Sequence, residues 1–323
     1  MYIPHVPKKP ELLRELSTSN IDELAKFQGN RNRQYTQLEA GELNVQFREA
    51  SLENVFIFKE TLNLGTRIQA APASSIIPFA YVLPPSSQIA FCGQTGVRDS
   101  FIQASGGTWD INFKGKLEYI GCAFNRDYFY ASYELLKGQA IPSQYLVSQI
   151  VPSQSAQQQA YALGLANILY FLHTNPFIYC YPDVIRLLCS QVFKFTSDAL
   201  PTITDSTHPS FRKYSFRIAA AKRVIDYLQE HAKELPDMQT LCKVAGTGER
   251  SLQYGFRDYL GMTPIQYLRV IRLNGVRAEL QGASYNQTKV TSVAVSWGFI
   301  ELGHFAKEYK KLFKELPSTT LHR

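Results

Sequence analysis

Four polar side chains in the last third of the chain are spaced to share one face of a helix. They are Arg250, Gln253, Tyr254 and Arg257, and residues three and four apart are neighbours on a helical surface. Arginine can donate two hydrogen bonds to guanine, and glutamine can pair with adenine through two hydrogen bonds. The pattern therefore indicates a helix that enters the major groove of DNA and reads bases.

Apolar residues in the same segment would hold this helix in place. The apolar side chains that face away from the polar set are Leu252, Phe256, Tyr259 and Leu260. A short helix near residues 238–245 and a Gly-Thr-Gly turn at 246–248 come before it, and an earlier helix begins near Ser215. This order predicts a first helix-turn-helix unit over residues 237–260, whose second helix is the recognition helix.

The pattern then recurs. Thr263-Pro264 is a helix start, and the helix that follows runs to about Gln281, a connector of about 27 Å. A second helix-turn-helix unit is predicted over residues 290–313. Its apolar face comprises Leu302, Phe305, Tyr309, Leu312 and Phe313, and its polar face comprises Gly303, His304, Lys307 and Lys311. Two such units could read two major-groove segments about one helical turn, ~34 Å, apart.

Residues 290–317 carry the family resemblance. Their sequence, from Val-Thr-Ser-Val-Ala to Lys-Glu-Leu-Pro, resembles the signature of AraC/XylS-family transcriptional regulators. Residues 250–256 and 261–267 are similar to that family's first unit, and Arg272-Leu273 to its connector. The resemblance covers about residues 215–323. It implies two helix-turn-helix subdomains that bind double-stranded promoter DNA, usually to activate transcription with RNA polymerase as a partner.

The resemblance implies roles for individual residues. The base-reading positions fall on Arg250, Gln253 and Tyr254 in the first unit and on Gly303, His304 and Lys307 in the second. We expect phosphate contacts from Arg257, Arg272, Lys310 and Lys311, with Arg269 and Arg277 as further candidates. Alternatives stay open: an ion pair with an internal carboxylate for Arg272, a solvated face for Lys310 and Lys311, and a plain polar or phosphate contact for His304.

Three residues depart from the family pattern. Gly248 stands where a Ser or Thr cap is frequent, which would cost the first recognition helix a few tenths of a kcal/mol. Lys314 replaces a frequent glycine before the final proline motif, which would reshape that terminus. Gly303 has no side chain with which to read a base, so the second unit would contribute mostly backbone contacts.

Charge is distributed unevenly along the chain. The 323 residues carry a formal net charge of +7. Residues 210–323 hold 18 Lys+Arg against 10 Asp+Glu, a net of +8, and residues 1–209 hold 16 against 17, a net of −1. This asymmetry indicates a neutral module joined to a module that meets a polyanion.

The neutral module is predicted to be β-rich and then helical. Residues 43–129 read as short strands separated by turn residues, typical of a sandwich or barrel, and residues 130–200 show helical spacing. We predict an α+β fold with an effector-sensing or dimerisation domain over 1–205 and a linker over 206–214. The DNA-binding domain is expected over 215–323, as an all-α unit with two helix-turn-helix subdomains joined by a long helix.

Two functions are open for the neutral module. The pattern from Phe47 to Thr61, with Leu83-Pro84 and Gly106-Gly107, resembles sensor domains of the ethanolamine-utilisation regulator type. The barrel aromatics would line a pocket for a small-molecule effector or simply form the core. One stripe of helical spacing would pack on the barrel or on a second subunit, as in a homodimer: Tyr161, Leu165, Ile168, Leu169 and Leu172. A second helical stripe is indicated by Val184, Leu187, Leu188, Gln191, Val192 and Phe195. The rival is a ligand-independent regulator whose first domain only dimerises.

Other function classes are disfavoured. No stretch reaches the about 18–20 apolar residues of a membrane span, and the first residues do not form a secretory signal, so we expect a cytoplasmic protein. All six histidines lie outside residues 43–129, which argues against a metal site on the barrel. No enzyme motif is present and no cofactor is expected. A DNA-anchored enzyme would need a reactive cysteine among basic residues, and of the five cysteines only Cys242, beside Lys243, has a basic neighbour.

Overall fold

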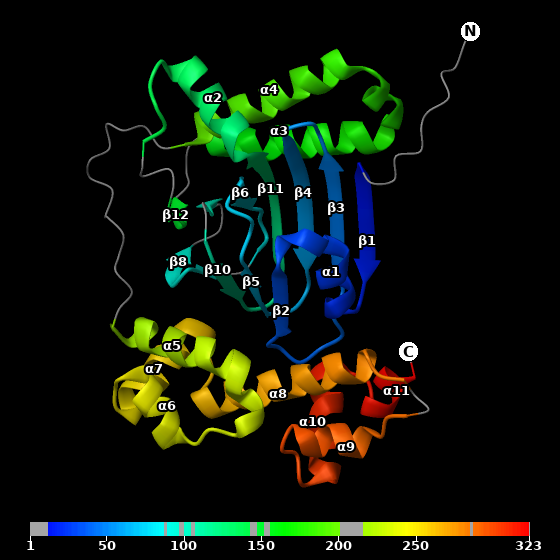
Figure 1. Ribbon diagram of the computed structural model, residues 1–323, viewed down its shortest axis with the longest axis vertical. Helices are drawn as coiled ribbons and strands as arrows, with labels where there is room; N and C mark the ends of the chain where they lie inside the picture. Colours follow the sequence, from blue (N-terminus) through cyan, green and yellow to red (C-terminus); the bar gives the residue numbers. More distant parts are fainter. Residues whose placement is uncertain are drawn as a thin grey trace.

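Two antiparallel β-sheets lie between a small group of helices at one end of the computed structural model and a larger group at the other end (Figure 1). The described residues are 12–86, 89–96, 100–104, 107–142, 147–151, 156–200, 216–284 and 287–322. The predicted α+β class is confirmed, with a β-rich first part and a helical second part. The predicted linker, 206–214, lies outside the described residues.

The larger sheet, sheet A, has seven strands in the order β1-β3-β4-β11-β6-β9-β12. Their bounds are β1 (Leu13–Thr18), β3 (Val45–Ser51), β4 (Val55–Leu62), β6 (Ile76–Val82), β9 (Phe101–Gln103), β11 (Leu117–Asn125) and β12 (Gln149–Val151). Side chains alternate between its two faces. On β4, Ile57 faces the upper helices, whereas Phe58 and Leu62 face the second sheet.

The smaller sheet, sheet B, has five strands in the order β2-β5-β10-β7-β8. Their bounds are β2 (Arg33–Gln37), β5 (Thr66–Ala70), β7 (Ile89–Phe91), β8 (Gln94–Gly96) and β10 (Trp109–Phe113). Its inner residues, such as Ile68 and Trp109, pack against sheet A. Its outer face carries Arg67 and Asp110, which are 1% and 2% exposed, so another part of the chain must cover them.

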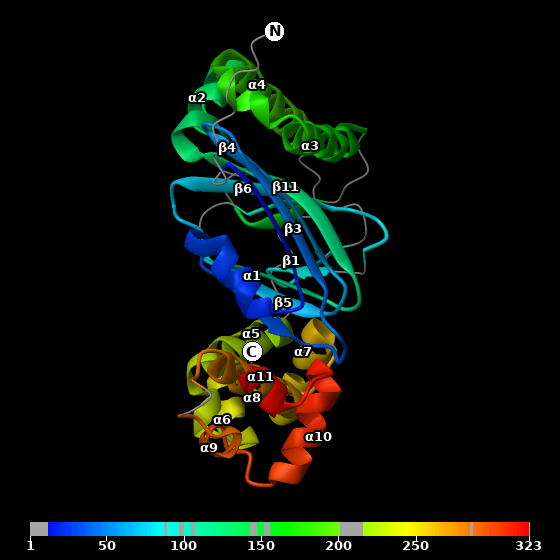
Figure 2. The same ribbon diagram turned by 90° about the vertical axis from the view of Figure 1, so that its right-hand side faces the viewer.

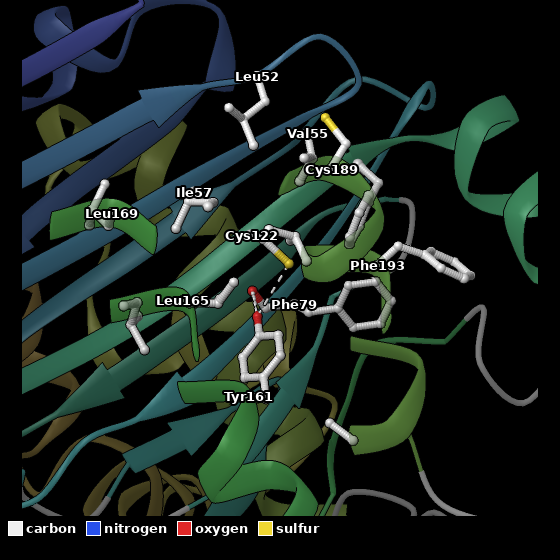
Figure 3. Close-up of a cluster of buried hydrophobic side chains, with 14 of the residues drawn as sticks. Leu52, Val55, Ile57, Phe79, Cys122, Tyr161, Leu165, Leu169, Cys189 and Phe193 are labelled. Carbon is white, nitrogen blue, oxygen red and sulfur yellow. Dashed lines mark hydrogen bonds between the residues drawn. The ribbon is translucent and has the colours of Figure 1, made fainter. Parts of the chain in front are cut away.

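A helical layer covers the outer face of sheet A (Figure 2). It consists of α2 (Arg126–Lys137), α3 (Ala156–Thr174), η3 (Pro176–Cys180) and α4 (Pro182–Ala199). Tyr161 and Leu165 of α3 point into a core with Ile57 and Phe79 of the sheet (Figure 3). The Tyr161 hydroxyl donates to the carbonyl of Phe79 at 3.1 Å and lies 3.4 Å from the sulfur of Cys122. The first predicted stripe is thus the face that packs on the sheet.

The second predicted stripe is offset by one residue from the most buried face of α4: Val192 is buried, Val184, Leu188 and Phe195 are half-buried against the core, and Leu187 and Gln191 are exposed. The buried side chains of α4 are Ile185, Cys189, Val192, Phe193 and Thr196. Leu187 is 58% exposed. Cysteine and threonine are small and carry weak apolar signals, yet they pack closely here: Thr196 Oγ1 lies 3.4 Å from Cys122 Sγ. The exposed Leu187 and the half-buried Leu188 therefore turn the predicted face by one residue from the buried one.

Strands also occur outside the predicted β-rich segment 43–129. β1, β2 and β12 lie before or after it. β1, Leu-Arg-Glu-Leu-Ser-Thr, is an edge strand with half-exposed and exposed side chains, so its sequence lacks a clear apolar alternation. The short helix α1 (Ile21–Gln28), which the sequence predicts near residues 21–27, lies between β1 and β2 and is capped by the Asn20 side chain.

A polar cluster is buried between the two sheets, around Glu60 of β4. Glu60 is fully buried and accepts hydrogen bonds from Arg33 at 2.7 Å, Tyr119 at 2.5 Å and Tyr35 at 2.8 Å. The Gln28 amide donates to Tyr35 Oη at 2.6 Å. Burial, followed by the negative charge of Glu60, raises the pKa of Tyr35. The cluster satisfies a buried ion pair with hydrogen bonds, the condition under which such a pair is tolerated.

The helices at the other end form the second part of the fold. They are α5 (Phe216–His231), η4 (Ala232–Glu234), α6 (Met238–Ala245), α7 (Glu249–Leu260), α8 (Pro264–Gln281), α9 (Val290–Ser296), α10 (Leu302–Phe313) and α11 (Pro317–Leu321). α8 links two small apolar cores, one around α5–α7 and one around α9–α11. No helix in the described ranges is long and apolar enough to cross a membrane.

Candidate DNA-binding interface

Helix α7 presents the predicted reading face to solvent. Leu252, Phe256 and Tyr259 on its back are 0–5% exposed. On its front, Arg250 and Arg257 are exposed, and Tyr254 is 38% exposed. Gln253 is half-buried, and its amide donates to the Glu249 carboxylate at 2.8 Å. Three of the four predicted side chains are therefore accessible to DNA. Gln253 would have to break its hydrogen bond with Glu249 to contact a base.

The sequence reasoning missed Arg217, which joins this face from α5. The Arg217 guanidinium lies 5.2 Å from the centre of the Tyr254 ring, and that of Arg250 lies 5.8 Å from the same ring. Helices α5 and α7 approach closely at Gly255, where an added Cβ would lie 2.2 Å from the Arg217 carbonyl oxygen. In the sequence, the sign of this close approach of α5 and α7 is Gly255, a glycine inside the predicted recognition helix.

The turn between α6 and α7 sets the direction in which α7 starts. Gly248 is the N-cap and offers no side-chain hydrogen bond, as the departure from the family pattern predicts. α6 has a better start, because the Asp237 carboxylate accepts from the Thr240 N–H at 2.8 Å. Gly246 ends α6 in the left-handed region, with φ of +61°. The left-handed turn lets the chain reverse between the two helices, a conformation in which glycine carries no steric penalty.

The connector α8 is anchored to the second unit by buried side chains. Thr263 and Gln266 form a reciprocal capping box at its start. Arg277 is 3% exposed, pairs with Glu315 at 3.2 Å and lies over the Phe313 ring at 4.7 Å. Arg277 thus braces the core, which disfavours its phosphate-binding alternative.

Arg272 is also held inside the protein. Its Nε donates to the Trp297 carbonyl at 2.5 Å, and its guanidinium lies 4.3 Å from the Phe299 ring centre. Burial, with the nearby charge of Arg269, lowers the pKa of Arg272. Its partner is a backbone carbonyl and not the internal carboxylate that the sequence leaves open. The predicted phosphate contact of Arg272 is therefore less well supported than those of the exposed Arg257, Lys310 and Lys311.

Helix α10 repeats the two-faced design with fewer reading groups. Phe305, Tyr309 and Phe313 are buried, and Gly303 and Lys307 are exposed. An added Cβ at Gly303 would meet nothing within 4 Å. His304 is 53% exposed but already engaged: Arg269 donates to its Nδ1 at 2.8 Å, and Glu308 lies 3.4 Å away. Lys314 ends α10 in the left-handed region, with φ of +60°, where the family pattern has glycine.

Both helix-turn-helix units dock on sheet B and its neighbouring loop. The Asp110 carboxylate of β10 accepts from Lys222 of α5 and from the Tyr259 hydroxyl of α7, both at 2.5 Å. Arg67 of β5 lies 3.5 Å from Asp110 and 3.3 Å from the Tyr267 hydroxyl of α8. Burial tends to raise the pKa of Asp110, but Lys222 and Arg67 outweigh it and hold that pKa below its usual value.

The second unit and α8 are held by hydrogen bonds from β2 and the loop after it, each of which has a backbone group on at least one side. The Gln37 side chain and the Gly41 N–H both donate to the Leu312 carbonyl at the end of α10, each at 3.0 Å. Asn274 in the middle of α8 exchanges two hydrogen bonds with the backbone of Gln37, at 3.0 Å each. The first part of the chain therefore contacts α7 and α10 near their C-terminal ends. The N-terminal halves of both helices point away from it.

The described residues offer little for the enzyme alternative. They contain no group of three or more His, Cys, Asp or Glu side chains placed to hold a metal ion. Burial raises the pKa of the Cys242 thiol, and Glu249 raises it further. A reactive cysteine needs the opposite shift.

Comparisons with known proteins agree with this geometry. A family described as a helix-turn-helix domain matches residues 241–323. The probable thc operon regulatory protein of Rhodococcus erythropolis is 39% identical over 97 residues, which cover 30% of this chain and 29% of the relative. The XylDLEGF operon transcriptional activator 2 of Pseudomonas putida is 38% identical over 100 residues, which cover 31% of this chain and 64% of that protein. The chain thus spans less than two thirds of each of these relatives.

Two solved structures of AraC-type regulators are also similar to this chain. A probable AraC family transcriptional regulator from Rhodopseudomonas palustris is 32% identical, covers 32% of this chain and 95% of its own, and has a TM-score of 0.31. The AraC-like transcriptional activator CuxR is 10% identical over 82% of this chain and 96% of its own, with a TM-score of 0.43. The resemblance of the first module to ethanolamine-type sensors stays a prediction. The C-terminal helix-turn-helix domain of the chain is thus similar to those of AraC/XylS-family transcriptional regulators.

Proposed function

We propose that this protein is a sequence-specific DNA-binding regulator of transcription whose two helix-turn-helix units contact two successive major-groove segments. The observation that carries the proposal is the repeated two-faced helix. α7 and α10 each bury an apolar back and turn a polar front outward, and α8 joins the two units through one continuous helix. In helix-turn-helix proteins, the N-terminal residues of the recognition helix contact the bases.

The exposed side chains divide into two roles. Arg250, Gln253 and Tyr254 would read bases in the first unit, with Lys307 and a freed His304 contributing less in the second. Arg257, Lys310, Lys311 and the neighbouring Arg217 would bind phosphates and set the register, because phosphate contacts position a protein without specifying sequence. Binding should weaken with salt as counterions are released.

Selection of duplexes from a random library by the full chain tests the proposal. We expect an enriched motif with two half-sites whose centres lie about 10–10.5 base pairs apart, the spacing of two groove segments on one face of the duplex. A control selection uses the triple variant R250A/R257A/K310A, which should enrich nothing. Recovery of random sequence by the wild-type chain would contradict the proposal.

The regulatory output is proposed from the relatives. The Pseudomonas relatives are named as transcriptional activators, so we propose activation through contact with RNA polymerase. The first module would act through the sheet B interface, because Asp110 and Gln37 hold both units in one arrangement. A small-molecule effector would have to bind the docked and released arrangements unequally to shift their balance.

A buried hydrogen-bond donor without a partner, inside the sandwich, supports effector sensing. The indole N–H of Trp109 is buried and has no hydrogen-bond partner among the described residues, and its ring lies 5.4 Å from the Arg33 guanidinium. An effector with an acceptor group would satisfy this donor. Thermal unfolding of the full chain with a panel of small molecules separates this role from the rival. A rise in melting temperature supports sensing, and no rise with any candidate favours dimerisation only.

Dimerisation would use the outer face of α3 and α4. Leu163 and Tyr170 are each 66% exposed and lie two turns apart on α3, and Leu187 of α4 is 58% exposed. α3 contains no Asp, Glu, Lys or Arg, so its part of the face brings no like charge to a second copy, and the exposed charges of α4 are paired as Asp183–Arg186 and Lys194–Asp198. This face lies at the opposite end of the molecule from α7 and α10 (Figure 1), which leaves the reading faces free.

Leu163→Glu should convert a dimer to a monomer, because each protomer would bring a buried, unpaired carboxylate to the interface. Sedimentation velocity of the full chain at tens of micromolar measures this. The matched control is Leu135→Glu on α2, where the leucine is 90% exposed, and it should leave the dimer intact. A monomeric wild-type chain would refute the dimer.

A further inference from the structure

The most exposed apolar side chain beside either recognition helix is Ile300, in the turn before α10. It is 85% exposed, and Leu302 at the start of α10 is 37% exposed. Ile300 precedes α10, and Leu302 is its first residue. The first turn of this helix is the part expected to enter the major groove of DNA. An isoleucine this exposed is an unusual choice for a residue type that ranks among the most often buried.

The polar side chain nearest to Ile300 along the chain is Glu301, the N-cap of α10, which is exposed and makes no capping hydrogen bond. Gly303 has no side chain, and the space before it is open. The Nδ1 atom of His304 is already in contact with Arg269 and Glu308. Apart from the Glu301 carboxylate, the start of α10 therefore presents apolar atoms where α7 presents arginine and tyrosine.

The turn that carries Ile300 packs against α8. Trp297 donates from its indole N–H to Glu279 at 2.8 Å, and its carbonyl accepts from Arg272. The Trp297 ring packs so closely on α8 that a Cβ added at Gly275 would lie 2.1 Å from it. Phe299 is buried beneath the Arg272 guanidinium. The residues just before Ile300 are thus packed in place, which lowers the entropic cost of a contact made there.

We propose that Ile300, with Leu302 beside it, recognises thymine through its C5-methyl group in the half-site of the second unit. The inference rests on the proposed DNA-binding function and names the chemistry that the second unit reads. In the major groove, the thymine methyl is the apolar feature by which proteins distinguish that base. Lys307, Lys310 and Lys311 on the same helix are exposed, and this basic surround favours a polyanion over an apolar protein surface as the occupant.

The test replaces thymine by deoxyuridine, which lacks only the methyl group, at each position of the selected duplex. For the full wild-type chain we expect about fourfold weaker binding at one or two thymines of the second half-site, the value of one buried methyl-sized group. Ile300→Ala should weaken binding to the thymine duplex by a similar factor and abolish the response to deoxyuridine. Ile300→Val should keep most of that response.

The control is Leu135→Ala, an equally exposed apolar residue of α2, which should bind both duplexes like wild type. Equal deoxyuridine responses in wild type and Ile300→Ala would overturn the inference and leave the DNA-binding proposal standing. So would unchanged DNA binding by Ile300→Ala with reduced transcription in a purified polymerase assay, which would assign Ile300 to a protein contact. Failure of the wild-type chain to bind any selected duplex would overturn both.

Discussion

Glu60→Gln is expected to lower the free energy of unfolding by about 3–5 kcal/mol, the cost of leaving a buried charge without its partner. Arg33 has a 5% exposed side chain and pairs with Glu60 at 2.7 Å. Glutamine preserves the shape and part of the hydrogen bonding to Tyr35 and Tyr119, so the loss reports mainly the missing negative charge. Urea denaturation of the full chain, followed by circular dichroism, measures it.

The matched control is Glu15→Gln. Glu15 pairs with Arg48 at 2.5 Å, but the two side chains are 56% and 43% exposed, and such pairs contribute about 0–1 kcal/mol. The double variant Glu60→Gln, Arg33→Met should recover much of the loss, because it removes the uncompensated charge as well. A Glu60→Gln loss no larger than that of the control would show that the cluster contributes little to the stability of the sandwich.

Asp110→Asn is expected to release the helix-turn-helix units from sheet B. Asparagine leaves Arg67, which is 1% exposed, without its nearest carboxylate and weakens the contact with Lys222. Loss of one partner of a buried pair costs about 3–5 kcal/mol, or two to four decades in the docking equilibrium. Hydrogen exchange of the full chain measures the effect: amides of β10 and α7 should exchange faster, and those of β4 and β11 should not.

Asp198→Asn is the control for this release, because Asp198 pairs with Lys194 on the exposed side of α4. Unchanged exchange in Asp110→Asn would show that other contacts hold the interface. The pH response has a definite sign. Because the pKa of Asp110 is held below its usual value, its contribution is present above about pH 3.9 and is lost as pH falls through the lower folded value. Docking should therefore be constant between pH 8 and pH 5.

The helix-turn-helix units could be predicted from the sequence because their apolar spacing is strong. Leu252 and Phe256, like Phe305 and Tyr309, are large residues at intervals of four, and the structure buries all of them. Turn glycines and proline mark where each helix ends, so α7, α8 and α10 lie where the pattern predicts them.

The contacts between the two parts of the chain could not be predicted. Lys222 and Asp110 are 112 residues apart, and periodicity carries no information about which surfaces meet. Lys222 lies outside the apolar stripe of α5 and reads as a solvated residue, yet it reaches a carboxylate on sheet B. The offset of the predicted apolar stripe on α4 has a related cause. Cys189 and Thr196 are buried although neither is a large apolar residue, and Thr196 packs against Cys122.

The central claim is that α7 reads DNA sequence through Arg250. The most direct measurement compares Arg250→Ala and Lys310→Ala on the selected duplex and on a set with each base pair changed. Arg250→Ala should cost about 1–3 kcal/mol and relax selection at one base pair, whereas Lys310→Ala should weaken all sequences alike and reduce the salt slope by about one. Equal weakening of every sequence by Arg250→Ala would make it a phosphate contact and contradict the account.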